Sequence, residues 1–184
     1  MFNMFDETTA PDGAREILEK TKAEFKMIPN LEKTMAGAPA LLEAYSTTWN
    51  IFKTTTLSEV EQQIVYQAAN FENECNYCVP WHTFLSRQAG MNQSDIEALR
   101  EGARLSNEKH EQLKRFTQSL IRTKGKVVKA DLNAFFQAGY TEQNALEVIL
   151  GIAIKTMSNY TNSIAGTPLD KAVEKLVWRK PLIE

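Results

Sequence analysis

The sequence has few of the residues that usually carry enzyme chemistry, with only two cysteines and two histidines in 184 residues. No apolar run approaches the roughly 18 residues needed to cross a bilayer, and the first residues, MFNMFDETTAPDG, lack the basic start and apolar core of a signal peptide. The net charge is only -2, so no basic field would attract nucleic acid. We therefore expect a cytoplasmic protein without a membrane or nucleic-acid partner. Disulfides in that compartment are mostly transient and catalytic.

The alternation of apolar and polar residues that marks exposed strands is also missing. Apolar residues instead recur with helical spacing, and Ser58 with Glu61 and Ser94 with Glu97 form capping-box patterns. The length fits one ordinary domain without linkers. The sequence thus predicts a compact all-α bundle forming a single domain over residues 1–184. The expected helices cover about 12–26, 31–35, 39–53, 59–72, 76–89, 94–100, 108–123, 129–138 and 142–158.

Both cysteines and one histidine fall within eight residues, as Cys75, Cys78 and His82. These spacings place the three side chains on one face of a helix. Pro80 is tolerated only in a first turn, which places the cysteines near the helix N-terminus, where the dipole favours a thiolate. We predict that Cys78 attacks, that Cys75 resolves, and that His82 shares a proton with Cys78.

Two other interpretations of the motif are core packing and a zinc site. Free cysteines often fill cores, but a cysteine pair with a histidine at a helix start is unusual for that role. A structural zinc site needs four ligands, and His110, the other histidine, lies at the start of a charged helix. The motif therefore favours a redox dithiol centre that needs no metal or other cofactor.

The motif Cys75-x-x-Cys78-x-x-x-His82 resembles that of the alkylhydroperoxidase D-like group of the carboxymuconolactone decarboxylase superfamily. Residues 28–31 (IPNL), 38–45 (APALLEAY), 56–58 (TLS), 152–162 (IAIKTMSNYTN) and 165–170 (AGTPLD) resemble its peroxidase-related members. The resemblance implies a compact helical fold with its motif core at about 57–90, assembled as homo-trimers or hexamers. It also implies hydroperoxide reduction in antioxidant defence, recharged by a thiol reductant protein or a small thiol. Carried over by position, Cys78 is peroxidatic, Cys75 resolving and His82 part of the proton relay.

The sequence departs from the family pattern at the relay acid. The family places a glutamate twelve residues before the first cysteine, where this chain has Gln63. Glutamine can orient a partner but cannot pass a proton. Gln63 and Tyr66 belong to a polar stripe that is either a solvated or intersubunit face or a hydrogen-bonding wall toward the thiols. Tyr77 stands where other members carry histidine. We take Gln63, Tyr66 and Tyr77 as supporting residues.

Three functions follow as hypotheses. The first is a dithiol peroxidase acting on hydrogen or organic hydroperoxides. The second is a redox-responsive binding or scaffold protein with little turnover. The third is an enzyme like carboxymuconolactone decarboxylase with vestigial thiols, although such decarboxylases typically lack this cysteine pair.

Overall fold

The computed structural model describes residues 2–181, and within this range the chain is helical with no β-strand. The all-α prediction is therefore confirmed. The nine α-helices and one 3₁₀ helix of this range are α1 Arg15–Phe25, α2 Asn30–Met35, α3 Pro39–Phe52, α4 Glu59–Glu72, α5 Cys78–Gln88, α6 Gln93–Glu101, α7 Glu108–Arg122, α8 Lys129–Gln137, α9 Glu142–Ala165 and η1 Lys171–Leu176.

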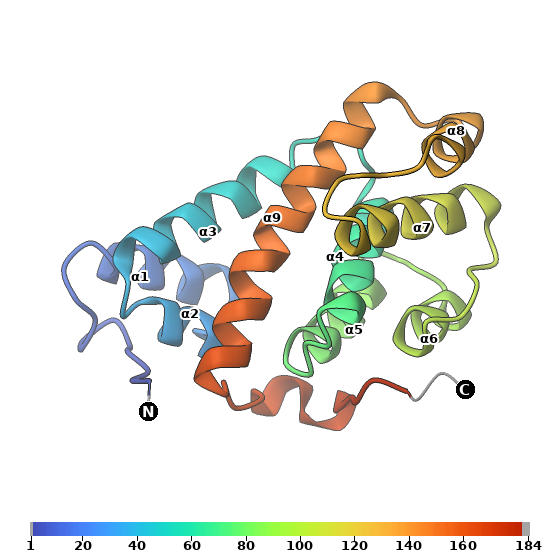
Figure 1. Ribbon diagram of the computed structural model, residues 1–184. Coiled ribbons are helices and arrows are strands. Elements are labelled where there is room, and N and C mark those ends of the chain that lie inside the picture. Colours follow the sequence, from blue (N-terminus) through green and yellow to red (C-terminus); the bar gives the residue numbers. More distant parts are fainter. Residues whose placement is uncertain (1, 182–184) are drawn as a thin grey trace.

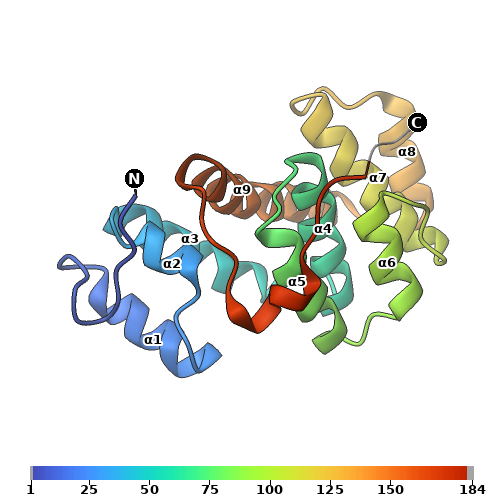
Figure 2. The same ribbon diagram turned by 90° about the horizontal axis from the view of Figure 1, so that it is seen from below.

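The longest helix, α9, crosses the middle of the molecule (Figure 1). Helices α1 to α3 lie on one side of it and α4 to α8 on the other, and α9 contacts α2, α3, α4 and α7. The motif helix α5 packs on α4 and α6, and η1 lies against it after the chain leaves α9 (Figure 2). Helix α5 thus lies among its sequence neighbours α4 and α6 and the distant element η1.

A glycine sets the close approach of α9 to its neighbours. A Cβ atom at Gly151 would lie 2.7 Å from Val65 Cγ1 and 2.9 Å from Phe52 Cζ, so only glycine fits between α3 and α4. Residues three to four positions apart share a helix face. The same face of α9 therefore continues with Lys155, Ser158 and further polar residues, all directed into the protein.

Three local features differ from the sequence-based expectation. Helix α6 is capped by Asn92, whose side chain accepts from the Asp95 N–H, and not by Ser94. Helix α9 continues seven residues past Ser158 and ends at Gly166, which adopts the left-handed conformation typical of a C-cap. The 3₁₀ helix was not expected. It is held because Arg100 donates to the carbonyls of Leu176 and Val177.

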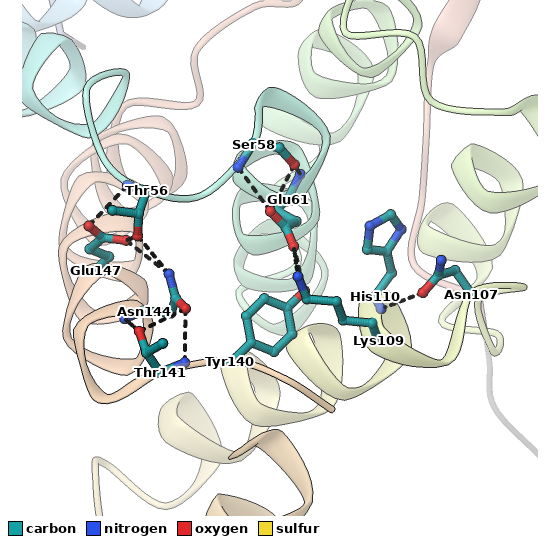
Figure 3. A network of polar contacts seen from close by, with 10 residues as sticks. All are labelled: Thr56, Ser58, Glu61, Asn107, Lys109, His110, Tyr140, Thr141, Asn144 and Glu147. Carbon is teal, nitrogen blue, oxygen red and sulfur yellow. Dashed lines mark hydrogen bonds and ion pairs between the residues drawn. The ribbon is translucent and has the colours of Figure 1, made fainter. Parts of the chain in front are cut away.

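The carboxylate of Glu61 is fully engaged in polar contacts at the start of α4 (Figure 3). It accepts from the backbone and hydroxyl of Ser58, completing the capping box, and from the Tyr140 hydroxyl at 2.9 Å. Lys109 forms an ion pair with it at 3.2 Å. Glu61 therefore joins α4 to α7 and to the start of α9 and does not replace the acid missing at position 63.

Within residues 2–181, none of the helices combines the length and the apolar character required to cross a bilayer.

Candidate active site

Cys78 is the first residue of α5, as the position of Pro80 predicted, but Cys75 lies three residues earlier, in the turn before the helix, and not on the helix face with Cys78 and His82. After α4, Glu74 adopts a left-handed backbone conformation with φ 53°, and the Cys75 N–H donates to the Asn70 carbonyl at 2.9 Å. This turn brings Cys75 Sγ to 3.3 Å from the Cys78 N–H, one of the N–H groups that a helix start leaves without a helical partner. The two thiols are buried, adjacent and not joined by a disulfide.

The polar face of α9 covers the thiols. Asn162 Nδ2 lies 3.2 Å from Cys78 Sγ and 3.9 Å from Cys75 Sγ, and Ser158 Oγ lies 3.9 Å from Cys78 Sγ. Asn162 donates to sulfur where water is largely excluded, whereas the Ser158 hydroxyl accepts from Cys78 and donates to the Lys155 carbonyl. Cys78 is accordingly held by polar partners, unlike a cysteine that merely fills a core.

The environment separates the two thiols by their pKa values. Burial raises the pKa of Cys78, but the hydrogen bond from Cys75 and the positive charge of Lys155 outweigh it and lower the pKa to about 6. The same hydrogen bond to Cys78 and burial raise the pKa of Cys75 well above its usual range. At neutral pH Cys78 is thus the thiolate and Cys75 the thiol, and only a thiolate can act as the attacking sulfur.

His82 makes different contacts from those expected. Its Nδ1 lies 2.8 Å from Gln63 Oε1 and its Nε2 lies 3.0 Å from Lys155 Nζ, and among the described residues it has no hydrogen bond to Cys78. Because a lysine ammonium can only donate, Nε2 accepts and Nδ1 carries the proton given to Gln63. Burial and the charge of Lys155 hold the pKa of His82 well below its usual range. The imidazole is therefore neutral, and it orients Lys155.

Tyr66 contributes through its ring. The ring centroid lies 4.8 Å from that of His82 and 5.6 Å from Lys155 Nζ, and Trp49 stacks on the ring at 5.0 Å. A cation over an aromatic face is stabilised by the ring quadrupole. Tyr66 thus helps to hold the buried ammonium in place.

A cavity of about 740 Å³ opens onto this cluster. Cys78, His82 and Lys155 line it, together with Glu32 of α2 and residues of α1 and α3. Acidic side chains outnumber basic ones among the other lining residues, which include Asp12, Glu16, Glu19, Glu24 and Glu43 against Arg15 and Lys20.

Tyr77 lines the cavity and holds one of its walls in place through hydrogen bonds. Its hydroxyl donates to the Asp170 carboxylate and accepts from the Leu31 N–H at 3.0 Å. Asp170 also accepts from the Asn30 N–H at 3.1 Å and from Trp81 Nε1 at 3.0 Å. The two residues therefore satisfy the N–H groups at the start of α2, which Pro29 cannot cap.

The Tyr77→Phe variant is expected to be less stable than wild type by about 1–3 kcal/mol, since it leaves a buried N–H and a buried carboxylate short of a partner. Chemical denaturation measures this difference. Tyr160→Phe is the matched control, because it removes a hydroxyl from an exposed tyrosine. Equal loss in both variants would contradict a bracing role for Tyr77.

Comparison with known proteins gives the same fold. A peroxidase-related protein from Ralstonia eutropha JMP134, an alkylhydroperoxidase AhpD core, superposes with a TM-score of 0.81 at 18% identity, over 94% of this chain and 95% of that chain. A peroxidase-related protein from Silicibacter sp. TM1040 has a TM-score of 0.76 at 20% identity, over 89% and 88%. The model of the carboxymuconolactone decarboxylase family matches residues 21–107, which contain the whole cysteine motif. The chain therefore has the AhpD-like fold, and it is similar to the carboxymuconolactone decarboxylase family over the part that carries the cysteines.

The debrominase Bmp8 has the same fold, with a TM-score of 0.75 at 16% identity over 95% of both chains. A cysteine-to-alanine variant of Bmp8 has been solved in complex with 2,3,4-tribromopyrrole. No sequence among curated proteins matches this chain. The fold therefore accommodates more than one activity, and the site must decide between them.

Five residues of this site were not predicted: Glu32, Lys155, Ser158, Asn162 and Asp170. One signal was available for Lys155, because it is a lone charge in an otherwise apolar stretch of its helix. Glu32 and Asp170 gave no comparable signal. Among residues 2–181, no three His, Cys, Asp or Glu side chains are placed to hold a metal ion.

Proposed function

We propose that the protein is a dithiol peroxidase that reduces hydrogen peroxide or organic hydroperoxides in antioxidant defence. The observation that carries this proposal is the Cys78 thiolate, which lines an open cavity while Cys75 lies against it as a thiol. A low-pKa thiolate beside a resolving thiol is the arrangement that peroxide reduction needs.

The reaction divides into three steps. Cys78 Sγ attacks the terminal peroxide oxygen, the S–O bond forms as the O–O bond breaks, and an alcohol or water leaves with a proton. The Cys75 thiol then attacks the Cys78 sulfenic acid, so that a disulfide forms and water leaves. An external dithiol returns two electrons and two protons. This cycle needs a compartment that keeps thiols reduced, and we therefore place the protein in the cytoplasm.

Lys155, His82 and Gln63 support the thiolate in this scheme. Lys155 supplies the positive charge, His82 Nε2 accepts a hydrogen bond from the Lys155 ammonium, and Gln63 fixes the tautomer of His82. None of the three needs to change protonation state during attack. These three side chains therefore act as a fixed electrostatic support for the thiolate, a role that needs no acid at position 63.

The cavity rim argues against lactone decarboxylation. Carboxymuconolactone carries carboxylates, and a predominantly acidic rim disfavours an anionic substrate. Neutral molecules, such as hydroperoxides, meet no such repulsion.

Reductive debromination is a second candidate, favoured by the size and aromatic lining of the cavity. About 740 Å³ far exceeds the space that hydrogen peroxide needs, and Tyr45, Trp49, Tyr77 and Trp81 line it. Bmp8 shares the fold, and its variant holds a bromopyrrole. The same dithiol supplies the two electrons that replacing a carbon–bromine bond by a carbon–hydrogen bond requires. Turnover of cumene hydroperoxide and of tribromopyrrole under identical conditions separates the two candidates.

The test of the peroxidase proposal is thiol titration followed by steady-state turnover. One equivalent of cumene hydroperoxide should consume both thiols, and dithiothreitol should then sustain repeated turnover. Oxidation without turnover would instead indicate the redox-responsive scaffold, and absence of oxidation would indicate vestigial thiols. Either of these results contradicts the proposal.

We also propose that the protein assembles as a homo-trimer or hexamer through α9. Leu146, Ile149, Tyr160 and Ile164 are 50–70% exposed, and their spacing places them on one face of this helix. An exposed apolar stripe of this length is typical of an interface.

Light scattering should give three or six times the 20.8 kDa of one chain. The double variant Ile149→Glu, Ile164→Glu should shift the mass toward that of one chain, because like charges would meet at the interface. Val177→Glu, at an exposed position outside α9, is the control and should leave the mass unchanged. A wild-type mass of one chain would contradict this assembly.

A further inference from the structure

The acid Glu32 occupies an unusual position for a carboxyl group. It lies in α2 and is only 9% exposed, yet it lines the cavity that also contains Cys78 and Lys155. Its Oε2 is buried without a hydrogen-bond partner among residues 2–181, and no ion pair to it is formed within the same range. A buried carboxylate in such a place is costly, so the neutral acid is the favoured form.

The charged and titratable groups around Glu32 come from every neighbouring element. Asp170 after α9 and Cys78 of α5 disfavour a negative charge on it, and Lys155 of α9 favours one. Tyr45 of α3 and Tyr77 before α5 are buried beside it and stay protonated. Burial dominates and raises the pKa of Glu32 to about 8. Cys78 is therefore ionised and Glu32 protonated over the same neutral pH range.

Peroxide cleavage requires a proton at the oxygen that leaves. When the O–O bond of an alkyl hydroperoxide breaks, an alkoxide forms, which is a strong base and a poor leaving group unless protonated. The family's acid position holds Gln63, and His82 donates its only proton to that glutamine. The Lys155 ammonium is needed to hold the Cys78 thiolate. Glu32 remains as the neutral acid of the cavity.

We propose that Glu32 is the general acid that protonates the leaving alkoxide of an organic hydroperoxide. This assignment rests on the proposed peroxidase function. Cys78 Sγ bonds to the terminal oxygen, which keeps its hydrogen as the sulfenic acid, and the alkoxide takes the Glu32 proton and leaves as the alcohol. When an external dithiol reduces the disulfide, the proton of the restored Cys78 thiol returns to Glu32. Over one complete cycle, Cys78 and Glu32 together therefore neither gain nor lose a proton.

The experiment compares two oxidants that differ in their leaving group. Single-turnover oxidation of Cys78 is followed with cumene hydroperoxide, which releases an alkoxide, and with 3-chloroperbenzoic acid, which releases a weakly basic carboxylate. Glu32→Gln should slow the reaction with the hydroperoxide about 100-fold but the reaction with the peracid by less than about threefold. Glu43→Gln is the matched control, because Glu43 lines the same cavity but is exposed. It should change neither rate.

The pH dependence of the wild-type protein gives a test that needs no variant. With cumene hydroperoxide the rate should rise as Cys78 ionises near pH 6 and fall as Glu32 ionises near pH 8. With the peracid, the rate corrected for the fraction of oxidant that is itself ionised should lack the fall that Glu32 causes. The same falling limb for both oxidants after this correction, or equal slowing of both by Glu32→Gln, would overturn the role of Glu32. If wild type reacts with neither oxidant, the peroxidase function itself fails.

Discussion

Cys78→Ser is expected to reduce peroxide turnover by about a thousandfold or more, to the uncatalysed background. A serine hydroxyl at this position is neither ionised at neutral pH nor able to accept the peroxide oxygen. All the structural features that activate the site, from the Lys155 charge to the Asn162 donor, act on this one sulfur. Steady-state consumption of cumene hydroperoxide with dithiothreitol as reductant measures the loss.

Cys75→Ser separates the two sulfur roles. It should still react once with peroxide, because Cys78 remains, and should accumulate a Cys78 sulfenic acid that a dimedone probe traps. Steady-state turnover through the internal disulfide should be lost. If Cys75→Ser gave no sulfenic acid while Cys78→Ser did, the assignment of the attacking sulfur would be reversed.

Lys155→Met should slow the reaction through the thiol pKa. Without the buried cation, the pKa of Cys78 should rise from about 6 toward the free-cysteine value of about 8.5. The thiolate fraction at pH 7 would then fall, by about 30-fold if the free value is reached, and the rate of peroxide attack would fall with it. The rate of alkylation by iodoacetamide as a function of pH reports the shift directly.

Lys109→Met is the control for that measurement. Lys109 pairs with Glu61 at the start of α4, and its side chain is 47% exposed. Its replacement removes the same charge from the protein without touching the thiols, so the alkylation midpoint should stay near pH 6. An unchanged midpoint in Lys155→Met would show that the low pKa has another source.

The helical architecture could be predicted because capping residues and apolar spacing are local signals. The Ser58 and Glu61 pair and the proline at position 39 start helices where expected. The last turns of α9 were missed because Asn159 and Asn162 read as polar loop residues. In the structure, Asn159 is buried and bonds to Asn70 at 3.0 Å and to Asn73 at 2.9 Å. Tertiary hydrogen bonds thus sustain a helix that local propensity would end.

The active site was predictable only where its residues are close in sequence. Cys75, Cys78 and His82 lie within eight residues, so the start of α5 and the turn before it are enough to bring them near one another. Lys155 and Asp170 reach the site from the far end of the chain, so no spacing links them to the cysteines. Glu32 stands next to Lys33 in a six-residue helix, where a charged pair suggests a surface. The predicted hydrogen bond between His82 and Cys78 is not formed, because His82 Nε2 accepts from Lys155 instead. No spacing in the sequence links Lys155 to the motif.

The most direct measurement of the central claim is the single-turnover rate of Cys78 oxidation by cumene hydroperoxide between pH 5 and pH 7.5. The structure predicts a rate that rises with a midpoint near pH 6 and levels off near pH 7, where the thiolate is almost fully formed and Glu32 is still protonated. A rate that is still rising steeply at pH 7.5 and never exceeds that of free cysteine would show that the site does not activate Cys78.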